Sequence, residues 1–102
     1  MSPSDVYTAT FSWRGCDDAR PWPLVRKTVG GWLCFAISRQ DYDRSPFEVP
    51  RADPDFPVTG LSATSYIYDA ESYHEVPTAA FGRRLGRLGG DLLNRFRKSA
   101  GV

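Results

Sequence analysis

A glycine pair between two apolar segments constrains this chain more than any other feature. Leu24–Val29 precedes Gly30-Gly31, and the nearly continuous apolar run Trp32–Ser38 follows at once. Short runs rich in β-branched and aromatic residues are typical of strands, and glycine accepts the positive φ of a two-residue hairpin turn. We therefore expect a β-hairpin with its turn at Gly30-Gly31, Pro23 at the start of its first strand, and a central second strand.

Two further segments have the patterns of strands, and another has that of a helix. Asp5–Trp13 alternates apolar and polar residues, and Ser65–Tyr68 is rich in β-formers, whereas Phe47–Val49 is a short segment bracketed by prolines. Near the end, apolar and basic residues predict a short amphipathic helix that begins near Gly90 and ends before Gly101. Short strands followed by one helix indicate a mainly β fold, a small barrel or twisted sheet, and 102 residues support one domain.

Composition narrows the setting of this domain. No apolar run is long enough to cross a bilayer, and the first five residues lack the basic and apolar segments of a secretion signal, so we expect a cytoplasmic protein. Cys34 lies in an apolar run and should be a small core residue, while Cys16 lies in a polar loop. Neither cysteine has a partner at metal-binding spacing, so no metal and no cofactor are predicted.

Charge is unevenly distributed along the chain. Residues 81–102 carry six basic residues against one acidic residue, although the net charge of the chain is only +1. A basic segment can attract a polyanion such as a nucleic acid. A solvated helix face explains the same charges, and charge alone favours that interpretation.

Six short segments, taken in order, resemble the MazF/PemK family of toxin ribonucleases. They are similar to the family's Gly-Asp-Val strand, Arg-Pro pair, Thr-x-Gln element, Pro-Phe-Glu-Val strand, Gly-Leu…Ser-Tyr-Val strand and Ile-Gly-Arg-Leu ending. No motif is specific alone, but together they cover almost the whole chain and imply a small SH3-like barrel. The segments are Ser4–Tyr7, Arg20-Pro21, Ser38–Gln40, Ser45–Val49, Gly60–Ile67 and Leu85–Leu88.

The resemblance implies a metal-independent endoribonuclease that cuts single-stranded RNA, leaving 2′,3′-cyclic phosphate and 5′-hydroxyl ends. Arg20 would stabilise charge on the phosphorane-like transition state, because its planar guanidinium matches phosphate oxygens. Ser38 would hydrogen-bond the scissile phosphate, and Gln40 would orient the phosphate or read a base edge. Without the resemblance, Arg20 is much better explained by a surface ion pair with Asp17 or Asp18. Ser38 is equally well explained as a polar strand end.

Two residues are reserve catalysts. His74 is the only histidine and its side chain suits acid–base chemistry, although a solvated loop histidine is the commoner outcome. The family's Arg-x-Asp element falls on Tyr68-Asp69-Ala70, so the pattern is not matched there. A one-residue bulge would return Asp69 to the site.

RNA contact needs cations and aromatic faces near the reacting groups. Trp13 continues the apolar face of its strand and should be buried. Trp22 lies between two prolines and has less reason to be buried. The candidates for RNA binding are Arg14, Trp22, Arg39, Gln40 and Arg44, with Tyr42 as a further stacking residue.

Three hypotheses of function remain open from the sequence. In the first, the protein is a toxin of a toxin–antitoxin system, a homodimer with RNA across its interface and a cognate antitoxin that blocks the groove. In the second, the same barrel has lost catalysis and binds RNA or protein. In the third, it is an adaptor with no nucleic-acid role, and Arg20 and Ser38 would then lie far apart.

Overall fold

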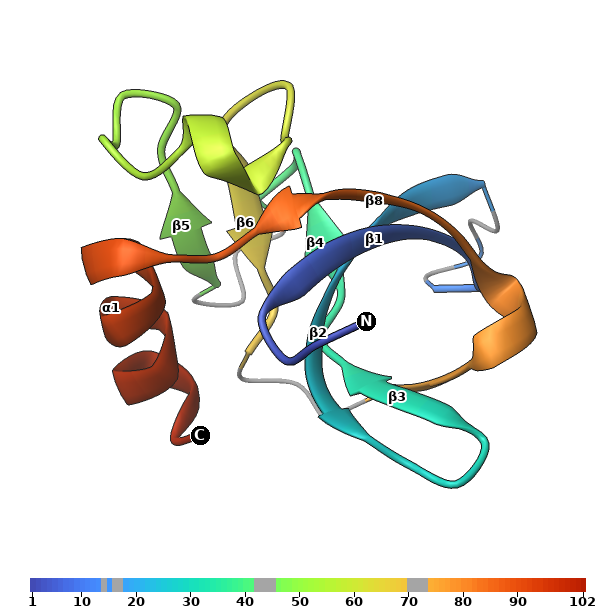
Figure 1. Ribbon diagram of the computed structural model, residues 1–102. Helices are drawn as coiled ribbons and strands as arrows, with labels where there is room; N and C mark the ends of the chain where they lie inside the picture. The colour runs from blue at the N-terminus through green and yellow to red at the C-terminus, as the bar shows by residue number, and fades with distance from the viewer. Residues whose placement is uncertain (14, 16–17, 42–45, 70–73) are drawn as a thin grey trace.

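The computed structural model describes residues 1–13, 15, 18–41, 46–69 and 74–102. Within these ranges the chain forms eight β-strands in two antiparallel sheets and one C-terminal α-helix (Figure 1). The predicted mainly β fold with a terminal helix is therefore confirmed. In the part of the chain that is described, strand pairing does not join the two sheets into a closed barrel. That part also has no helix with the length and apolarity to traverse a lipid bilayer.

The larger sheet has five strands in the order β7-β3-β2-β1-β8. Every neighbouring pair is antiparallel. The nine-residue β2 is the longest strand and lies at the centre of this sheet. The strands are β1 (Asp5–Thr10), β2 (Ala19–Lys27), β3 (Gly31–Cys34), β7 (His74–Pro77) and β8 (Phe81–Arg87).

The smaller sheet has three strands in the order β4-β6-β5, comprising β4 (Ile37–Ser38), β5 (Phe47–Val49) and β6 (Ser65–Ile67). The apolar run predicted as one strand is thus two, because the chain leaves β3 after Cys34 and enters β4 in the other sheet. Phe35 and Ala36 between them are 2% and 0% exposed and belong to opposite cores. The run is apolar throughout because both of its sides are covered.

The hairpin forms, but its turn is one residue earlier than predicted. Thr28 N–H donates to the Gly31 carbonyl at 2.9 Å, and Gly31 N–H donates to Thr28 Oγ1 at 3.0 Å, so Val29 and Gly30 make the turn. Neither glycine has a positive φ. Gly31 is needed for close approach instead, since a Cβ there would lie 2.0 Å from the Val76 carbonyl oxygen on β7.

The first hairpin strand also begins earlier than expected. Pro21 and Pro23 both lie inside β2, paired with Thr8 and Val6 of β1, so the prediction of Pro23 at the strand start is wrong. The partner on the other side, β3, pairs with β2 only from Leu24 onward. The prolines therefore fall where β2 has a ladder on one side only, and the missing N–H groups cost no sheet hydrogen bond there.

Strands β7 and β8 were not predicted. His74, which was expected in a loop, begins β7 opposite Cys34. The first three basic residues of segment 81–102, Arg83, Arg84 and Arg87, lie on the edge strand β8 rather than on the helix. Gly86 lets β8 approach the 3₁₀ helix η1 (Pro57–Thr59), because a Cβ at Gly86 would lie 2.1 Å from the Val58 carbonyl oxygen. Glycines placed for this contact interrupt the alternation that would otherwise mark a strand.

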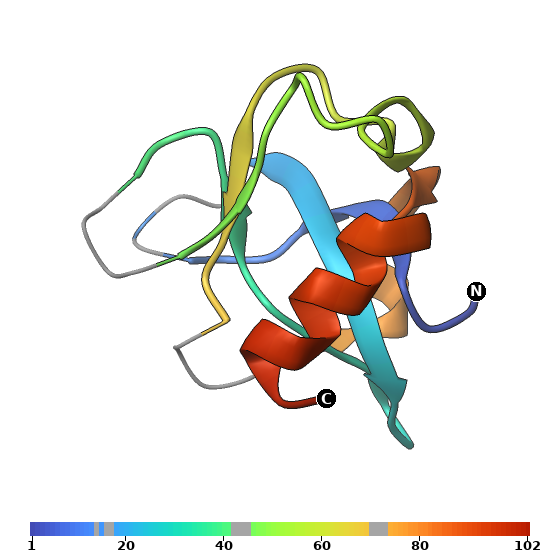
Figure 2. The same cartoon turned by 90° about the vertical axis from the view of Figure 1, so that its left-hand side faces the viewer.

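The helix α1 (Gly90–Ala100) ends at Gly101, whose φ of 73° is left-handed, so both predicted ends are confirmed. Its first turn is capped from a distant loop, where the Asp55 carboxylate accepts the Leu92 N–H at 3.1 Å. Phe96 packs edge-on against Phe35 at 6.0 Å between ring centroids. In Figure 1 α1 lies along the left flank of the molecule, and Figure 2 views the molecule from that flank, with α1 in front.

Two cores result from this arrangement. The helix-side core consists of Val6, Phe35, Ile37, Val49, Phe56, Ile67, Leu88, Leu92 and Phe96. The aromatic core consists of Ala9, Trp13, Trp22, Leu24, Trp32, Cys34, Ala36, Tyr68 and Val76. The expected burial of Trp13 and Cys34 is confirmed, at 6% and 0% exposure.

Candidate functional site

A cavity of about 580 Å³ lies where the start of β2 meets the end of β4. It therefore lies at the junction between the two sheets. Arg20 and Ser38, the two residues predicted to carry catalysis, both line it, as do the predicted RNA contacts Arg39 and Gln40. The full lining is Asp18, Ala19, Arg20, Pro21, Ile37, Ser38, Arg39, Gln40, Leu61, Ser62 and Ser65.

Arg20 is positioned by an aromatic support. It is the second residue of β2, paired with Ala9 of β1, and its guanidinium carbon lies 5.3 Å from the centroid of the Trp13 ring. Stacking on tryptophan restrains a guanidinium while its N–H edge remains able to bind oxygen. The Arg20 Nε atom is buried and has no hydrogen-bond partner among the residues that the structure describes. A buried donor of this kind is costly unless a ligand or water completes it, which is typical of a binding site.

Ser38 is positioned by a turn that follows β4. Its Oγ accepts the Gln40 N–H at 3.1 Å, and the Gln40 carbonyl accepts the Tyr68 hydroxyl at 2.5 Å. Tyr68 itself is only 1% exposed. A buried phenol therefore fixes the backbone that holds the Ser38 hydroxyl at the cavity.

Tyr68 connects both supports. Its ring lies 5.2 Å from that of Trp13, the ring beneath Arg20, while its hydroxyl holds the turn of Ser38. One buried side chain thus contacts the support of each predicted reacting group. The sequence reasoning missed this role, since it assigned to Tyr68 only the place of an absent arginine. The available signal was its position at the end of a β-rich segment, which favours burial.

The remaining lining residues bring mixed polarity. Two cations, Arg20 and Arg39, face one carboxylate, that of Asp18, among the lining residues that the structure describes. The hydroxyls come from the smaller sheet, at Ser38 and Ser65, and from the loop before β6, at Ser62, although the hydroxyl of Ser65 is already donated to the Ala63 carbonyl at 2.9 Å. The lining contributions of Asp18, Leu61 and Ser62 had not been predicted. These residues lie in loops, and nothing in the sequence of those loops predicts that they line a cavity beside β2.

Trp22 does not lie on the surface. It is 0% exposed and packs edge-on against Phe11 at 5.5 Å and His74 at 5.6 Å between ring centroids. The inference from its flanking prolines was wrong, because the tertiary packing of β2 decides its burial. Trp22 is part of the aromatic core and does not line the cavity.

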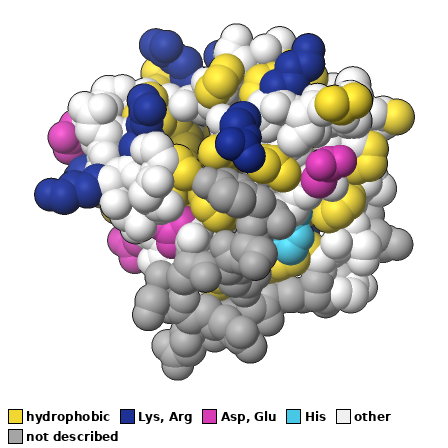
Figure 3. Space-filling model, turned by 90° about the horizontal axis from the view of Figure 1, so that it is seen from below, with side chains coloured by type: hydrophobic (Ala, Val, Ile, Leu, Met, Phe, Trp, Pro, Cys, Tyr) yellow, Lys and Arg dark blue, Asp and Glu magenta, His cyan; other side chains and the backbone are white. Residues whose placement is uncertain are grey.

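The two reserve catalysts also lie away from the cavity. His74 packs against Trp22 and Phe11 in the β7 region, and its Nε2 is buried without a partner. Figure 3 shows this histidine, the only one in the chain, among hydrophobic side chains on its face of the molecule. The Asp69 carboxylate accepts the Ser99 hydroxyl of α1 at 2.7 Å, and neither reserve residue lines the cavity. Arg14, Tyr42 and Arg44 lie outside the described residues.

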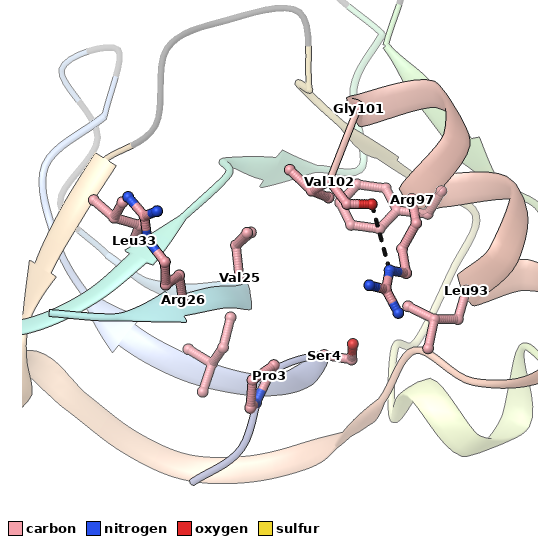
Figure 4. Close-up of a pocket in the computed structure, with 11 residues that line it drawn as sticks. Pro3, Ser4, Val25, Arg26, Leu33, Leu93, Arg97, Gly101 and Val102 are labelled. Atoms are coloured by element: carbon pink, nitrogen blue, oxygen red, sulfur yellow. Dashed lines mark hydrogen bonds between the residues drawn. The ribbon is translucent and has the colours of Figure 1, made fainter.

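A second cavity, of about 460 Å³, opens between the C-terminal end of α1 and strands β2 and β3 (Figure 4). Its wall is largely aliphatic, and the Arg97 Nε donates to the Val102 carbonyl at 3.4 Å. Of the residues predicted for catalysis or RNA binding, none that the structure describes lines it. In the described ranges, no three His, Cys, Asp or Glu side chains gather as a metal-binding group.

Comparison with models of known protein families finds no match for this chain, and comparison with curated proteins finds no relative. The geometry of the Arg20–Ser38 cavity is therefore the basis for a functional proposal.

Proposed function

We propose that this protein is a MazF/PemK-type endoribonuclease, a small SH3-like barrel that cuts single-stranded RNA at the Arg20–Ser38 cavity. One observation carries the proposal: the guanidinium and the hydroxyl that the resemblance assigns to catalysis line the same cavity. They are 18 positions apart in the sequence and come from different sheets. An adaptor without a nucleic-acid role gives no reason for them to meet.

The reaction is an internal transfer at phosphorus. The ribose O2′ attacks the adjacent phosphorus, the bond from phosphorus to O5′ breaks, and 2′,3′-cyclic phosphate and 5′-hydroxyl ends form. Negative charge grows on the non-bridging oxygens in the transition state. Arg20 binds these oxygens through a charged planar N–H edge, and the Ser38 hydroxyl donates to the phosphate.

The supports of the two groups favour catalysis over simple adhesion. Groups that are held before the substrate arrives need little reorganisation when charge develops, and this is a large source of rate enhancement. Arg20 is restrained by Trp13, and Ser38 by the turn that Tyr68 holds. As a toxin of this class, the protein would act as a homodimer and be restrained by a cognate antitoxin protein.

The test is cleavage of single-stranded RNA by the purified chain in the presence of EDTA, with analysis of the product ends. We expect cyclic-phosphate ends, and a rate reduced by about 10²–10³ in Arg20→Ala, the cost typical of a lost transition-state donor. Arg26→Ala is the control, because Arg26 is another arginine on β2 but is exposed and lines the other cavity. Undiminished cleavage by Arg20→Ala, or no cleavage of any RNA by the folded wild-type protein, would refute the proposal.

The second candidate is a binding module in which this barrel has lost its activity. It is favoured by Tyr68, whose hydroxyl is committed to the Gln40 carbonyl where the family pattern has an arginine. Asp69, the nearest carboxylate of that pattern, is likewise committed to Ser99. RNA binding without cleavage, weakened in Arg20→Ala, is the result that identifies this alternative.

A further inference from the structure

Asp18 brings a carboxylate to the cavity of the proposed nuclease. It lies two residues before Arg20, at the entry to β2, and its exposed side chain lines the same space as Arg20 and Ser38. We propose that Asp18 is the general base that removes the proton from the ribose 2′-hydroxyl. This inference rests on the nuclease activity proposed above, for which no proton acceptor has yet been named.

The chemistry of the other lining residues leads to this assignment. Arg20 and Arg39 are permanent cations and cannot accept a proton, and the amide of Gln40 is not basic. The serine hydroxyls are far too weak as bases near neutral pH. Among the described residues of the lining, Asp18 is therefore the one side chain suited to take a proton from a hydroxyl.

The reserve candidates do not compete for this role. Asp69 is hydrogen-bonded to Ser99 on α1, and His74 is packed among aromatic rings of the other core. Neither lines the cavity. The base in this chain would thus come from the loop before the Arg-Pro pair, and not from the segment after β6.

The step balances with groups already named and water. The Asp18 carboxylate takes the proton of the 2′-hydroxyl as O2′ forms its bond to phosphorus. Arg20 neutralises the non-bridging oxygens, the P–O5′ bond breaks, and water supplies the proton that completes the 5′-hydroxyl. Solvent restores the ionised Asp18 before the next turnover, and its exposed position allows this exchange.

Asp18→Asn keeps the shape of the side chain and removes its basicity. We expect kcat to fall by about 10²–10⁴, the usual contribution of general base catalysis, with KM unchanged. Binding of an RNA that carries 2′-deoxyribose at the cut site, and is therefore uncleavable, should also be unchanged. Glu48→Gln is the control, because Glu48 is an exposed carboxylate on β5 that does not line the cavity.

Chemical rescue separates a base from a structural residue. Asp18→Ala leaves space at the entrance to the cavity, so added formate should restore part of the cleavage rate, whereas chloride at the same ionic strength should not. Asp18→Glu should retain more activity than Asp18→Asn. A residue that merely shapes the loop would not respond to formate.

The outcomes distinguish this inference from the proposal beneath it. If the wild-type protein cuts no RNA, the nuclease proposal fails. If the wild-type protein cuts RNA and Asp18→Asn cuts it equally fast, the nuclease stands and Asp18 is not its base. Weakened binding of uncleavable RNA by Asp18→Asn, or absence of formate rescue in a folded Asp18→Ala, would also overturn the assignment.

Discussion

The two cores of this protein treat buried polar atoms differently. Next to the helix-side core, Thr59 is 0% exposed, yet its hydroxyl donates to the Phe56 carbonyl at 2.7 Å and accepts the Leu61 N–H at 3.1 Å. Around the aromatic core, three buried nitrogen atoms lack a hydrogen-bond partner within the described ranges: Arg20 Nε, Trp22 Nε1 and His74 Nε2. Satisfied groups stabilise a fold, whereas an unpartnered buried group costs free energy.

The two regions also differ in the structures that they support. The helix-side region carries the loop that caps α1, with Asp55 on Leu92, and the ion pair of Asp53 with Arg95. There the Asp55 N–H and the Arg95 guanidinium both hold the pKa of the Asp53 carboxyl below its ordinary value. The aromatic core meets the cavity through Trp13, whose ring supports Arg20. Cores give up stability most often at functional sites, and here one of the three unpartnered atoms, Arg20 Nε, belongs to a residue that lines the proposed site.

The largest expected effect tests whether the aromatic core is closed to water. Burial raises the pKa of the Cys34 thiol from 9.0 to about 12. At pH 8 the reactive thiolate should therefore be about 10³-fold scarcer in the folded protein than in the unfolded one. Alkylation of Cys34 by iodoacetamide, followed by mass spectrometry in a Cys16→Ser background, should be slower by at least that factor without denaturant.

The same burial has a consequence for stability. Since the folded-state pKa is raised, the contribution of the neutral thiol is fully present below pH 9.0 and is lost as the pH rises toward about 12. Rapid alkylation of the native protein would mean that water enters this core. The unpartnered nitrogens would then be solvated, and the contrast between the two cores would disappear.

An intermediate effect is expected next to the helix-side core, where the buried Thr59 hydroxyl is hydrogen-bonded. Thr59→Val preserves shape but removes both hydrogen bonds of the hydroxyl, so the free energy of unfolding should fall by about 2 kcal/mol. Urea unfolding followed by tryptophan fluorescence measures it. Thr10→Val, at an exposed position on β1, is the control and should change stability little. A neutral Thr59→Val would show that these bonds do not stabilise the fold.

The smallest effect is expected next to the aromatic core, where buried nitrogen atoms lack hydrogen-bond partners among the described residues. His74→Phe keeps an aromatic ring against Trp22 and Phe11 and removes a nitrogen that has no partner. The free energy of unfolding should stay the same or rise by up to about 1 kcal/mol. Equilibrium unfolding of this variant alongside Thr59→Val gives the comparison directly. A loss as large as that of Thr59→Val would indicate that the histidine is bonded in solution.

Local signals explain what the sequence analysis found. The helix from Gly90 was predictable because its amphipathic pattern and the glycine after its last residue are local, and β6 was predictable because its β-forming residues are consecutive. The turn was misplaced because the Thr28 side chain, and not glycine conformation, closes it. Strand β8 was missed because its glycines serve close contacts with segments distant in the sequence, Gly86 with η1 and Gly82 with Thr8 of β1.

In the candidate site, too, the features that local sequence did not predict depend on contacts between distant segments. The meeting of Arg20 with Ser38 was expected only through the family resemblance, because nothing in residues 20–38 alone brings two sheets together. Trp22 was misjudged because burial depends on which face of β2 meets the aromatic core. The role of Tyr68 could not be predicted, since its hydroxyl bonds a carbonyl 28 residues away.

Because the cavity forms where the two sheets meet, it has no counterpart in a piece of the chain that holds only one of them. Its walls are drawn from residues 18 to 65, and the turn of Ser38 is bonded to Tyr68 beyond them. A nascent chain on the ribosome must therefore emerge past Tyr68 before Arg20 and Ser38 have a common space.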